Sequence, residues 1–444
     1  MNKHDSYQNT GIEWIGRIPS EWDLIRGKYL FLSTKEINKN LQCKNLLSLT
    51  YDGVLNKDYE SSEGLRPENY NTYQIFKKND LVFKMIDLKN VKTSRVGIVH
   101  EDGIMSSAYI RQEPIKEKID SKFAYWFYYD LYKKEIYNSI GSGVRSTLSS
   151  SDLLEIELPT PPLEEQKLIS RYLDKKSEQI DMLIDKIQKK IELLKEQRTS
   201  LIHQCVTKGL DPNVEMKNTN IKWIGKIPKN WNTIPNKYIF LEYFGGSWGD
   251  DPKDDQKENL VRVIRVTEFN MKTLCISSNI PTIRSLKLKK NSKKYIKKND
   301  LILEKSGGGE KTPVGRVVLI DKDLPYPTVN SNFTNICRPN PNIVCPKFVV
   351  YSFWSKYKNG QTLRNIKQTT GIQNLDLSGF MSEIFILPEI EEQIKISKYL
   401  DNKIYNINNM IKKLDSKISL LKEYRKSFIS SAVTGVIRVS EELI

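Results

Sequence analysis

The feature that most constrains this 444-residue sequence is an internal repeat of short motifs. Residues 9–19 return at 218–228, where eight of the eleven positions are identical. Each half then closes on Leu-Pro followed by Glu-Glu-Gln, at 158–166 and again at 387–393. The segments between these flanks barely resemble one another. The sequence therefore predicts a duplicated frame that carries two different inserts.

Two long stretches, which start near residues 164 and 391, have apolar residues at alternating steps of four and three. This heptad spacing is typical of a coiled coil. Every seam position in one stretch is offset by 227 from its counterpart: Ile180, Ile184, Ile187, Ile191, Leu194, Arg198, Leu201 and Cys205, against Ile407, Ile411, Leu414, Ile418, Leu421, Arg425, Phe428 and Ala432. We expect helices of about 60 Å each. Duplicated copies favour two-fold packing, so we expect the two helices to be antiparallel.

Arg198 and Arg425 interrupt the two seams at matching positions. One interpretation is that each reaches solvent or pairs with a neighbouring acid. The other is that they fix the helix register or contact a partner subunit.

The formal net charge of +16 favours a polyanionic partner, most simply nucleic acid. Most of the excess lies in the inserts, although a composition rich in Lys, Asn and Ile could also raise the charge without function. Five cysteines form no CxxC pair, which excludes an evident zinc site or disulfide framework. No stretch approaches the roughly 18 apolar residues of a membrane span, and no secretory signal is evident, so a cytoplasmic location is expected.

The inserts, 20–157 and 229–386, read as short strands separated by Gly, Asn, Asp and Pro turns. Both contain Lys-Lys-Asn-Asp-Leu and, later, an aromatic segment that we expect to be helix core instead of a base-stacking platform. The predicted fold class is α/β: two α/β domains separated by two long antiparallel coiled-coil helices, with a pseudo-two-fold internal repeat.

The Trp-Ile-Gly-x-Ile-Pro-x-x-Trp openings, the Glu-Glu-Gln entries into long helices and the divergent inserts resemble a type I restriction–modification specificity subunit. The resemblance covers essentially the whole chain in the family's order. It implies target recognition domain 1 at 1–157, a central helix at 158–210, target recognition domain 2 at 211–386, a distal helix at 387–438 and a tail at 439–444.

In that family each recognition domain reads one half of a split double-stranded DNA target, and the helices act as a ruler. The resemblance implies docking of two adenine-N6 methyltransferase subunits in the bacterial cytoplasm, with restriction and translocase subunits as further partners. It also implies a non-catalytic chain without cofactors, while S-adenosylmethionine, ATP and Mg belong to partner subunits.

The residues independently argue against catalysis. Pro161-Pro162 lacks the flanking groups of an adenine-methyltransferase loop, and Glu310 replaces the glycine that a phosphate loop needs before its lysine. The three histidines lie far apart in sequence, so no general-base constellation is evident.

DNA contacts are expected from Lys and Arg to phosphates, and from Arg, Lys, Asn and Gln to base edges. Each insert has two candidate loops, for which a plain surface turn is the alternative. One pair of loops contributes Lys89, Lys92, Ser94 and Arg95 in the first insert, and Lys305, Gly307, Gly308, Gly309, Lys311 and Arg316 in the second. The other pair contributes Arg145 and Ser146, and Gln373 and Asn374 at the equivalent place, which predicts guanine and adenine preferences respectively.

The densest basic run includes Lys287, Lys289 and Lys290, and alternates with leucines. This pattern predicts a hairpin laid along phosphates, or alternatively a solvated charged edge strand.

A rival function is a coiled-coil scaffold that joins two protein-binding domains, although the basic inserts argue against it. A methylation system without a nuclease is another possibility. The sequence does not specify the DNA target or its spacer length.

Overall fold

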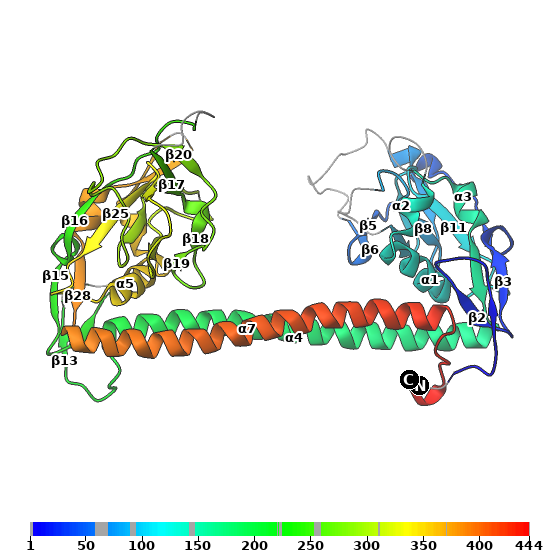
Figure 1. The fold of residues 1–444 in the computed structure, drawn as a ribbon. Helices are drawn as coiled ribbons and strands as arrows, with labels where there is room; N and C mark the ends of the chain where they lie inside the picture. The colour runs from blue at the N-terminus through cyan, green and yellow to red at the C-terminus, as the bar shows by residue number, and fades with distance from the viewer. Residues whose placement is uncertain are drawn as a thin grey trace. The chain divides into compact units, whose positions relative to one another are not determined.

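The computed structural model describes residues 3–57, 70–88, 95–141, 147–219, 221, 224–252, 259–309, 311–369 and 371–443. The chain divides into two compact units (Figure 1). The first contains residues 1–188 and 415–444, and the second contains residues 189–414. Both long helices pass from one unit into the other, so each unit holds one α/β head and a part of each helix. We call the heads head 1 (residues 3–160) and head 2 (residues 216–387).

The long helices are α4 (Leu163–Lys208) and α7 (Ile390–Val433). In the first unit Tyr172 stacks edge-on against Phe428, with ring centroids 6.3 Å apart, and Asp181 pairs with Arg425. Residue numbers rise along one helix as they fall along the other, so the pair is antiparallel, as predicted. The seam residues Ile180, Ile184, Ile187, Ile191, Leu194, Cys205, Ile407, Phe428 and Ala432 are at most 9% exposed.

Head 1 is built on a four-stranded antiparallel sheet in the order β4-β11-β8-β9. These strands are Phe31–Leu32, Ile110–Pro114, Leu81–Phe83 and Val96–Ile98. Two-stranded pairs surround it: β1 (Tyr7–Asn9) with β2 (Arg17–Pro19), β3 (Asp23–Arg26) with β12 (Glu157–Thr160), β5 (Leu47–Thr50) with β6 (Gly53–Asn56), and β7 (Gln74–Phe76) with β10 (Gly103–Met105). Its helices are α1 (Ser121–Lys133), α2 (Ile136–Ile140) and α3 (Ser150–Glu155).

Head 2 has a larger, six-stranded sheet in the order β16-β25-β21-β23-β19-β18. These strands are Phe240–Gly245, Thr334–Pro339, Leu301–Glu304, Val317–Leu319, Cys275–Ile276 and Phe269–Asn270. A three-stranded sheet orders β20 (Ile283–Ser285), β17 (Leu260–Ile264) and β24 (Thr328–Asn330). The pairs β13 (Met216–Asn218) with β14 (Lys226–Pro228), and β15 (Asn232–Pro235) with β28 (Ile384–Leu387), repeat pairs of head 1. The helices are α5 (Pro346–Lys358) and α6 (Leu377–Ser382).

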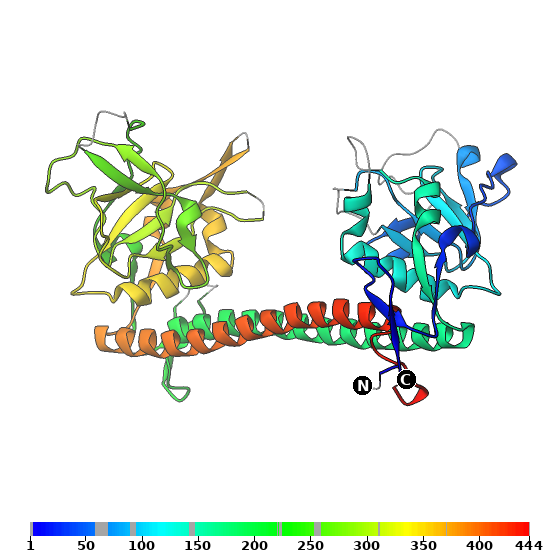
Figure 2. The same ribbon diagram turned by 45° about the vertical axis from the view of Figure 1, so that its right-hand side comes forward.

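The aromatic segments form α1 and α5, which lie between each sheet and the long helices of the same unit (Figure 2). Phe123, Tyr128 and Phe348 are fully buried, so the expected core role of these segments is confirmed. An aspartate anchors each helix to its unit: Asp174 accepts from Trp126 Nε1 at 2.9 Å, and Asp401 accepts from the Tyr351 hydroxyl at 2.7 Å.

The repeated tryptophans attach each head to the start of one long helix. Trp22 Nε1 donates to Glu165 Oε2 at 3.2 Å in the first unit. Trp231 Nε1 donates to Glu392 Oε2 at 2.8 Å in the second. Both tryptophans are buried, so these residues of the repeated motif contribute to the packing of a head on a long helix.

The glutamine of each Glu-Glu-Gln motif is buried and satisfies three backbone groups. Gln393 Oε1 accepts from the amide of Cys345 at 2.9 Å. Its side-chain amide donates to the carbonyls of Ile343 and Pro388 at 3.0 and 2.8 Å. Gln166 repeats the set with Asp120 N, Lys118 O and Pro161 O.

The other long helix ends against the same tryptophan. Gly209 and Gly435 follow α4 and α7 with φ of +82° and +70°, the left-handed conformation that glycine favours at a helix end. A Cβ at Gly209 would lie 3.3 Å from the Trp231 ring, and one at Gly435 would lie 3.0 Å from the Trp22 ring. Each head therefore contacts the start of one long helix and the end of the other.

Candidate DNA interface

The two candidate loops of head 2 lie side by side in one small sheet. The glycine-rich strand β22 (Ser306–Gly307) pairs with β27 (Ile372–Leu375), which forms a hairpin with β26 (Ile366–Thr369). At its base, the amide of Leu375 donates to the carbonyl of Lys305 at 2.7 Å. Segments about 65 residues apart in sequence thus form one surface element.

Head 1 joins its two candidate loops through the equivalent bond. The amide of Leu148 donates to the carbonyl of Met85 at 3.0 Å. Leu148 is offset by 227 from Leu375, the same offset as the helix seams. Beyond this bond, the predicted DNA contacts Lys89, Lys92, Ser94, Arg145 and Ser146 lie outside the described residues and stay predictions.

The glycine-rich loop of head 2 needs glycine at Gly307 and Gly308, whose φ values are +125° and +34°. A Cβ at Gly308 would come within 2.8 Å of the Val314 amide nitrogen. The backbone of residues 307–309 is half-buried, and Lys311 is exposed beside it. The glycines therefore let the loop close on Val314, which is a structural reason for them in addition to the predicted DNA approach.

The prediction that Gln373 reads a base is corrected by its burial, since the side chain is only 6% exposed. Its Oε1 accepts from Val314 N at 3.3 Å and its Nε2 donates to Gln368 Oε1 at 3.4 Å. Asn374 is half-buried, and its Oδ1 accepts from Ser306 Oγ at 2.5 Å. Both side chains hold the hairpin to the glycine-rich strand.

Arg316 is also paired with a residue of its own head. Its guanidinium makes two hydrogen bonds to the Glu304 carboxylate, at 2.7 and 2.6 Å, and this pairing raises the pKa of Arg316. Glu304 is 1% exposed, so the bidentate pair neutralises a buried acid. Arg316 therefore supports the glycine-rich loop through Glu304, and its predicted contact with DNA stays a prediction.

Arg95 in head 1 is corrected for a similar reason. It is 3% exposed, and its guanidinium donates to the carbonyls of Lys84, Ile86 and Asp87 at 3.2, 3.0 and 2.7 Å. These bonds close the turn that follows β8. Arg95 thus satisfies backbone carbonyls instead of facing DNA.

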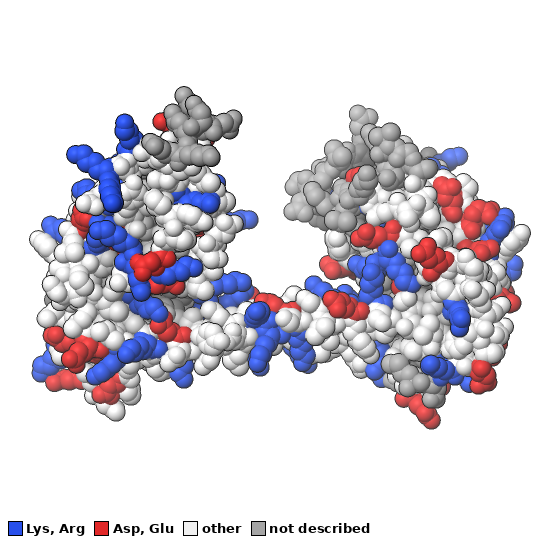
Figure 3. All heavy atoms as spheres, in the orientation of Figure 1, with Lys and Arg blue, Asp and Glu red and all other residues white. Residues whose placement is uncertain are grey.

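The basic run of head 2 is exposed but does not form the predicted hairpin. Strand β20 ends at Ser285, and the residues from there to β21 are irregular. Leu286 and Leu288 pack against a core cluster with Trp248, while Lys287, Lys289 and Lys290 are exposed. The leucines therefore point toward the core and the lysines toward solvent, although this segment does not pair with β20 as a hairpin strand. Figure 3 shows Lys and Arg side chains spread over the upper part of the visible face of this unit.

Both seam arginines have partners within their own unit. Arg198 donates to Asn408 Oδ1 at 2.8 Å, and its guanidinium lies 5.9 Å from the Trp354 ring centre. Arg425 forms an ion pair with Asp181. The pairing interpretation holds for Arg425, whereas a contact of either arginine with a partner subunit stays a prediction.

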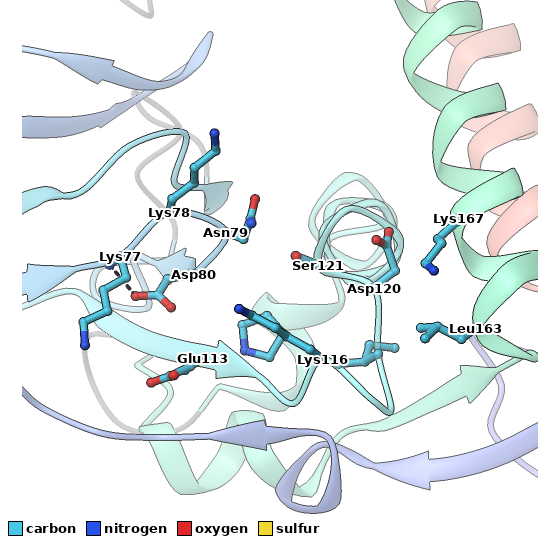
Figure 4. Close-up of a pocket in the computed structure, with 12 residues that line it drawn as sticks. Lys77, Lys78, Asn79, Asp80, Glu113, Lys116, Asp120, Ser121, Leu163 and Lys167 are labelled. Atoms are coloured by element: carbon cyan, nitrogen blue, oxygen red, sulfur yellow. Dashed lines mark hydrogen bonds between the residues drawn. The ribbon is translucent and has the colours of Figure 1, made fainter.

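A cavity of about 230 Å³ lies at the foot of head 1 (Figure 4). Its lining comes from the turn at 77–80, the segment 113–121 and the start of α4. In that turn the Asp80 carboxylate accepts from the amide of Lys77 at 2.7 Å. Among the described residues, no predicted DNA contact lines this cavity.

Comparison with known proteins decides the family. The model of the type I restriction modification DNA specificity domain matches residues 18–193 and 228–419, which is most of the chain. The chain belongs to this family. The resemblance inferred from the short motifs is thereby confirmed, and each of the two family matches begins with one head and ends within a long helix.

Two members of the specificity family resemble the chain along most of its length. It is 23% identical over 435 residues to the type I restriction enzyme MjaVIII specificity subunit of Methanocaldococcus jannaschii, covering 95% of this chain and 94% of that one. It is 24% identical over 353 residues to the EcoBI specificity subunit of Escherichia coli, covering 76% and 69%.

Two solved structures share the fold of this specificity-family chain. One, reported for complex assembly and conformational transition of the type I R-M system, has a TM-score of 0.70 at 13% identity and covers 95% of this chain and 99% of that one. The HsdS subunit from Thermoanaerobacter tengcongensis has a TM-score of 0.54 at 14% identity, with coverage of 95% and 98%. The predicted α/β fold with two long helices is confirmed.

In the described part of the chain, no three His, Cys, Asp or Glu side chains are grouped so that they could hold a metal ion. Within the same residues, no helix combines the length and apolar character needed to cross a membrane.

Proposed function

We propose that this chain is the DNA sequence-specificity subunit of a type I restriction–modification complex, and that head 1 and head 2 each bind one half of a split target. The long helices set the spacing between the half-sites and dock two methyltransferase subunits. Restriction and translocase subunits complete the assembly in the cytoplasm. The chain itself is non-catalytic, and S-adenosylmethionine, ATP and Mg act in the partner subunits.

The observation that carries this proposal is an equivalent backbone hydrogen bond in each head, at the base of the two candidate loops. Leu148 donates it to Met85 in head 1, and Leu375 donates it to Lys305 in head 2. The loops themselves differ in sequence, as two readers of different half-sites must. The net charge of +16 supplies the sequence-independent attraction to DNA.

Methylome sequencing of a host that carries this chain with its methyltransferase subunit tests the proposal. The expected result is one split motif, two short specific blocks separated by a spacer of unspecified sequence. A continuous motif would contradict the two-head model. Failure of the assembled complex to retard genomic DNA in a gel would instead favour the scaffold function.

A further inference from the structure

We propose that Gln368, on strand β26, is a base-reading residue of head 2 and that buried Gln373 positions it. This inference rests on the proposed function and deepens it, because it names a specificity-determining side chain. Its basis is the geometry of the β26–β27 hairpin. The ligand is the base edge of a duplex, most simply adenine, which an amide side chain recognises with one donor and one acceptor.

One face of the hairpin runs from the core to the surface. Successive residues of a strand alternate between faces, so Ile366 and Gln368 share a face with their cross-strand partners Leu375 and Gln373. Leu375 is buried, and Ile366 packs against the same core cluster. Gln373 is buried one step further out, and Gln368 is exposed. Gln368 is therefore where this face reaches solvent.

A hydrogen bond from Gln373 orients the side chain of Gln368. Gln373 Nε2 donates to Gln368 Oε1 at 3.4 Å, and Gln373 is itself oriented because its Oε1 accepts from Val314 N at 3.3 Å. The side-chain amide of Gln368 thus turns its oxygen toward Gln373. Among the described residues, none accepts from its Nε2, so that donor and one lone pair of Oε1 remain for a ligand.

The glycine-rich loop in turn positions Gln373. Gly308 allows the close approach of Val314, since a Cβ there would lie 2.8 Å from the Val314 nitrogen. Gly307 pairs directly with Gln373 across the two strands. The loop and the hairpin, which sequence alone treats as two separate candidates, therefore act together to present one amide.

The test compares methylomes of the assembled complex containing wild type, Gln368→Ala, Gln373→Ala and the double variant. Gln368→Ala should lose discrimination at one position of one half-site, by about 5- to 150-fold if a bidentate contact is lost. The other half-site, read by head 1, is an internal control and should not change. Exposed Lys322→Ala, elsewhere on head 2, is a control that should leave both half-sites unchanged.

The double variant separates reading from support. If Gln373 acts through Gln368, the double variant should have the same relaxed position as Gln368→Ala, without an added effect. Thermal unfolding of each variant tests whether Gln373→Ala merely unfolds head 2; Gln368→Ala remains decisive in that case, because its side chain is exposed.

Two results would overturn the inference. One is an unchanged motif with Gln368→Ala; the other is an even loss of methylation at all sites without a change in sequence preference. Either leaves the proposed function intact as long as the wild-type motif is split. A wild-type motif that is not split would defeat the proposed function itself.

Discussion

Arg198 Nη1 donates a hydrogen bond to Asn408 Oδ1 at 2.8 Å, and the same pair of positions in the other unit holds Arg425 and Asp181. Both members are offset by 227 residues. The duplicated seam therefore keeps its arginine and varies its acceptor, from a neutral amide to a carboxylate. Asn408 also donates to the carbonyl of Lys272 at 3.2 Å, so it connects the seam to head 2.

We expect Asn408→Ala to destabilise the protein by about 1–2 kcal/mol, because the half-buried Arg198 loses an acceptor. Asp181→Ala should cost less than about 1 kcal/mol, since the Asp181 side chain is 58% exposed and water replaces the lost contact. Urea unfolding of the two variants measures the difference. Equal effects would show that the two units do not differ at this position.

Gln393→Ala should be among the most destabilising single changes, by roughly 2–4 kcal/mol, because it leaves one buried amide and two carbonyls without partners. Gln166→Ala should do the same in the first unit. Hydrogen exchange should rise locally, at the Cys345 amide for Gln393→Ala and at the Asp120 amide for Gln166→Ala. An exchange increase confined to the exposed helix surface would contradict this role.

We expect Lys356 to make the stability of head 2 depend on pH. It is fully buried and donates to the carbonyl of Ile384 at 2.7 Å, and burial lowers its pKa to about 8. Between about pH 8 and 10 the unfolded chain holds a proton that the folded chain has released, so this group adds stability as pH rises. From pH 7 to 9, the wild type should gain roughly 1 kcal/mol relative to Lys356→Met.

Thermal unfolding at pH 7, 8 and 9 measures this gain. Lys358→Met changes an exposed lysine at the end of the same helix and should keep the wild-type pH dependence. A constant difference between wild type and Lys356→Met across these pH values would show that Lys356 stays charged in the folded protein.

Replacing Lys287, Lys289 and Lys290 with glutamine should weaken DNA binding evenly across sequences and flatten its salt dependence. Each lost phosphate contact should reduce the slope of log K against log salt by about 0.9. The matched control removes three exposed lysines of α4, Lys186, Lys189 and Lys190. If both triple variants keep the wild-type slope, the basic run does not contact phosphates.

Deleting one heptad from each long helix, residues 185–191 and 412–418, should shorten the pair by about 10 Å while preserving the seam. We expect the spacer of the split motif to change, or assembly to fail, while any half-site still read keeps its sequence. Methylome sequencing measures both properties. An unchanged spacer in a functional complex would contradict the ruler role of the helices.

The sequence predicts the frame better than it predicts the interface, for a physical reason. Heptad spacing and aromatic helical segments predict directly which residues are buried, because apolar residues repeat at the period of the helix. The sequence pattern does not predict the partners of polar residues. Arg95 and Arg316 look like DNA contacts, yet Arg95 binds backbone carbonyls and Arg316 binds Glu304. A signal for the second did exist, since Glu304 ends an apolar strand and a buried acid needs a cation.

Gln368 was missed because its role depends on a long-range pairing. Nothing in its neighbourhood of the sequence distinguishes it from Gln373, which lies on the same hairpin face. The distinction comes from strand β22, more than 60 residues earlier, which pairs with β27 and leaves β26, with Gln368, at the edge of the small sheet. Burial of polar residues at such a junction follows from tertiary structure and not from local composition.

The attachment of each head has a consequence for how such proteins diversify. The anchoring side chains, Trp22 with Gln166 and Trp231 with Gln393, all belong to the repeated motifs at the borders of the inserts. Genetic recombination within those similar borders would exchange a whole head and keep these four anchoring side chains in one event. A new DNA preference could then arise by cassette exchange, without passing through a chain that fails to fold.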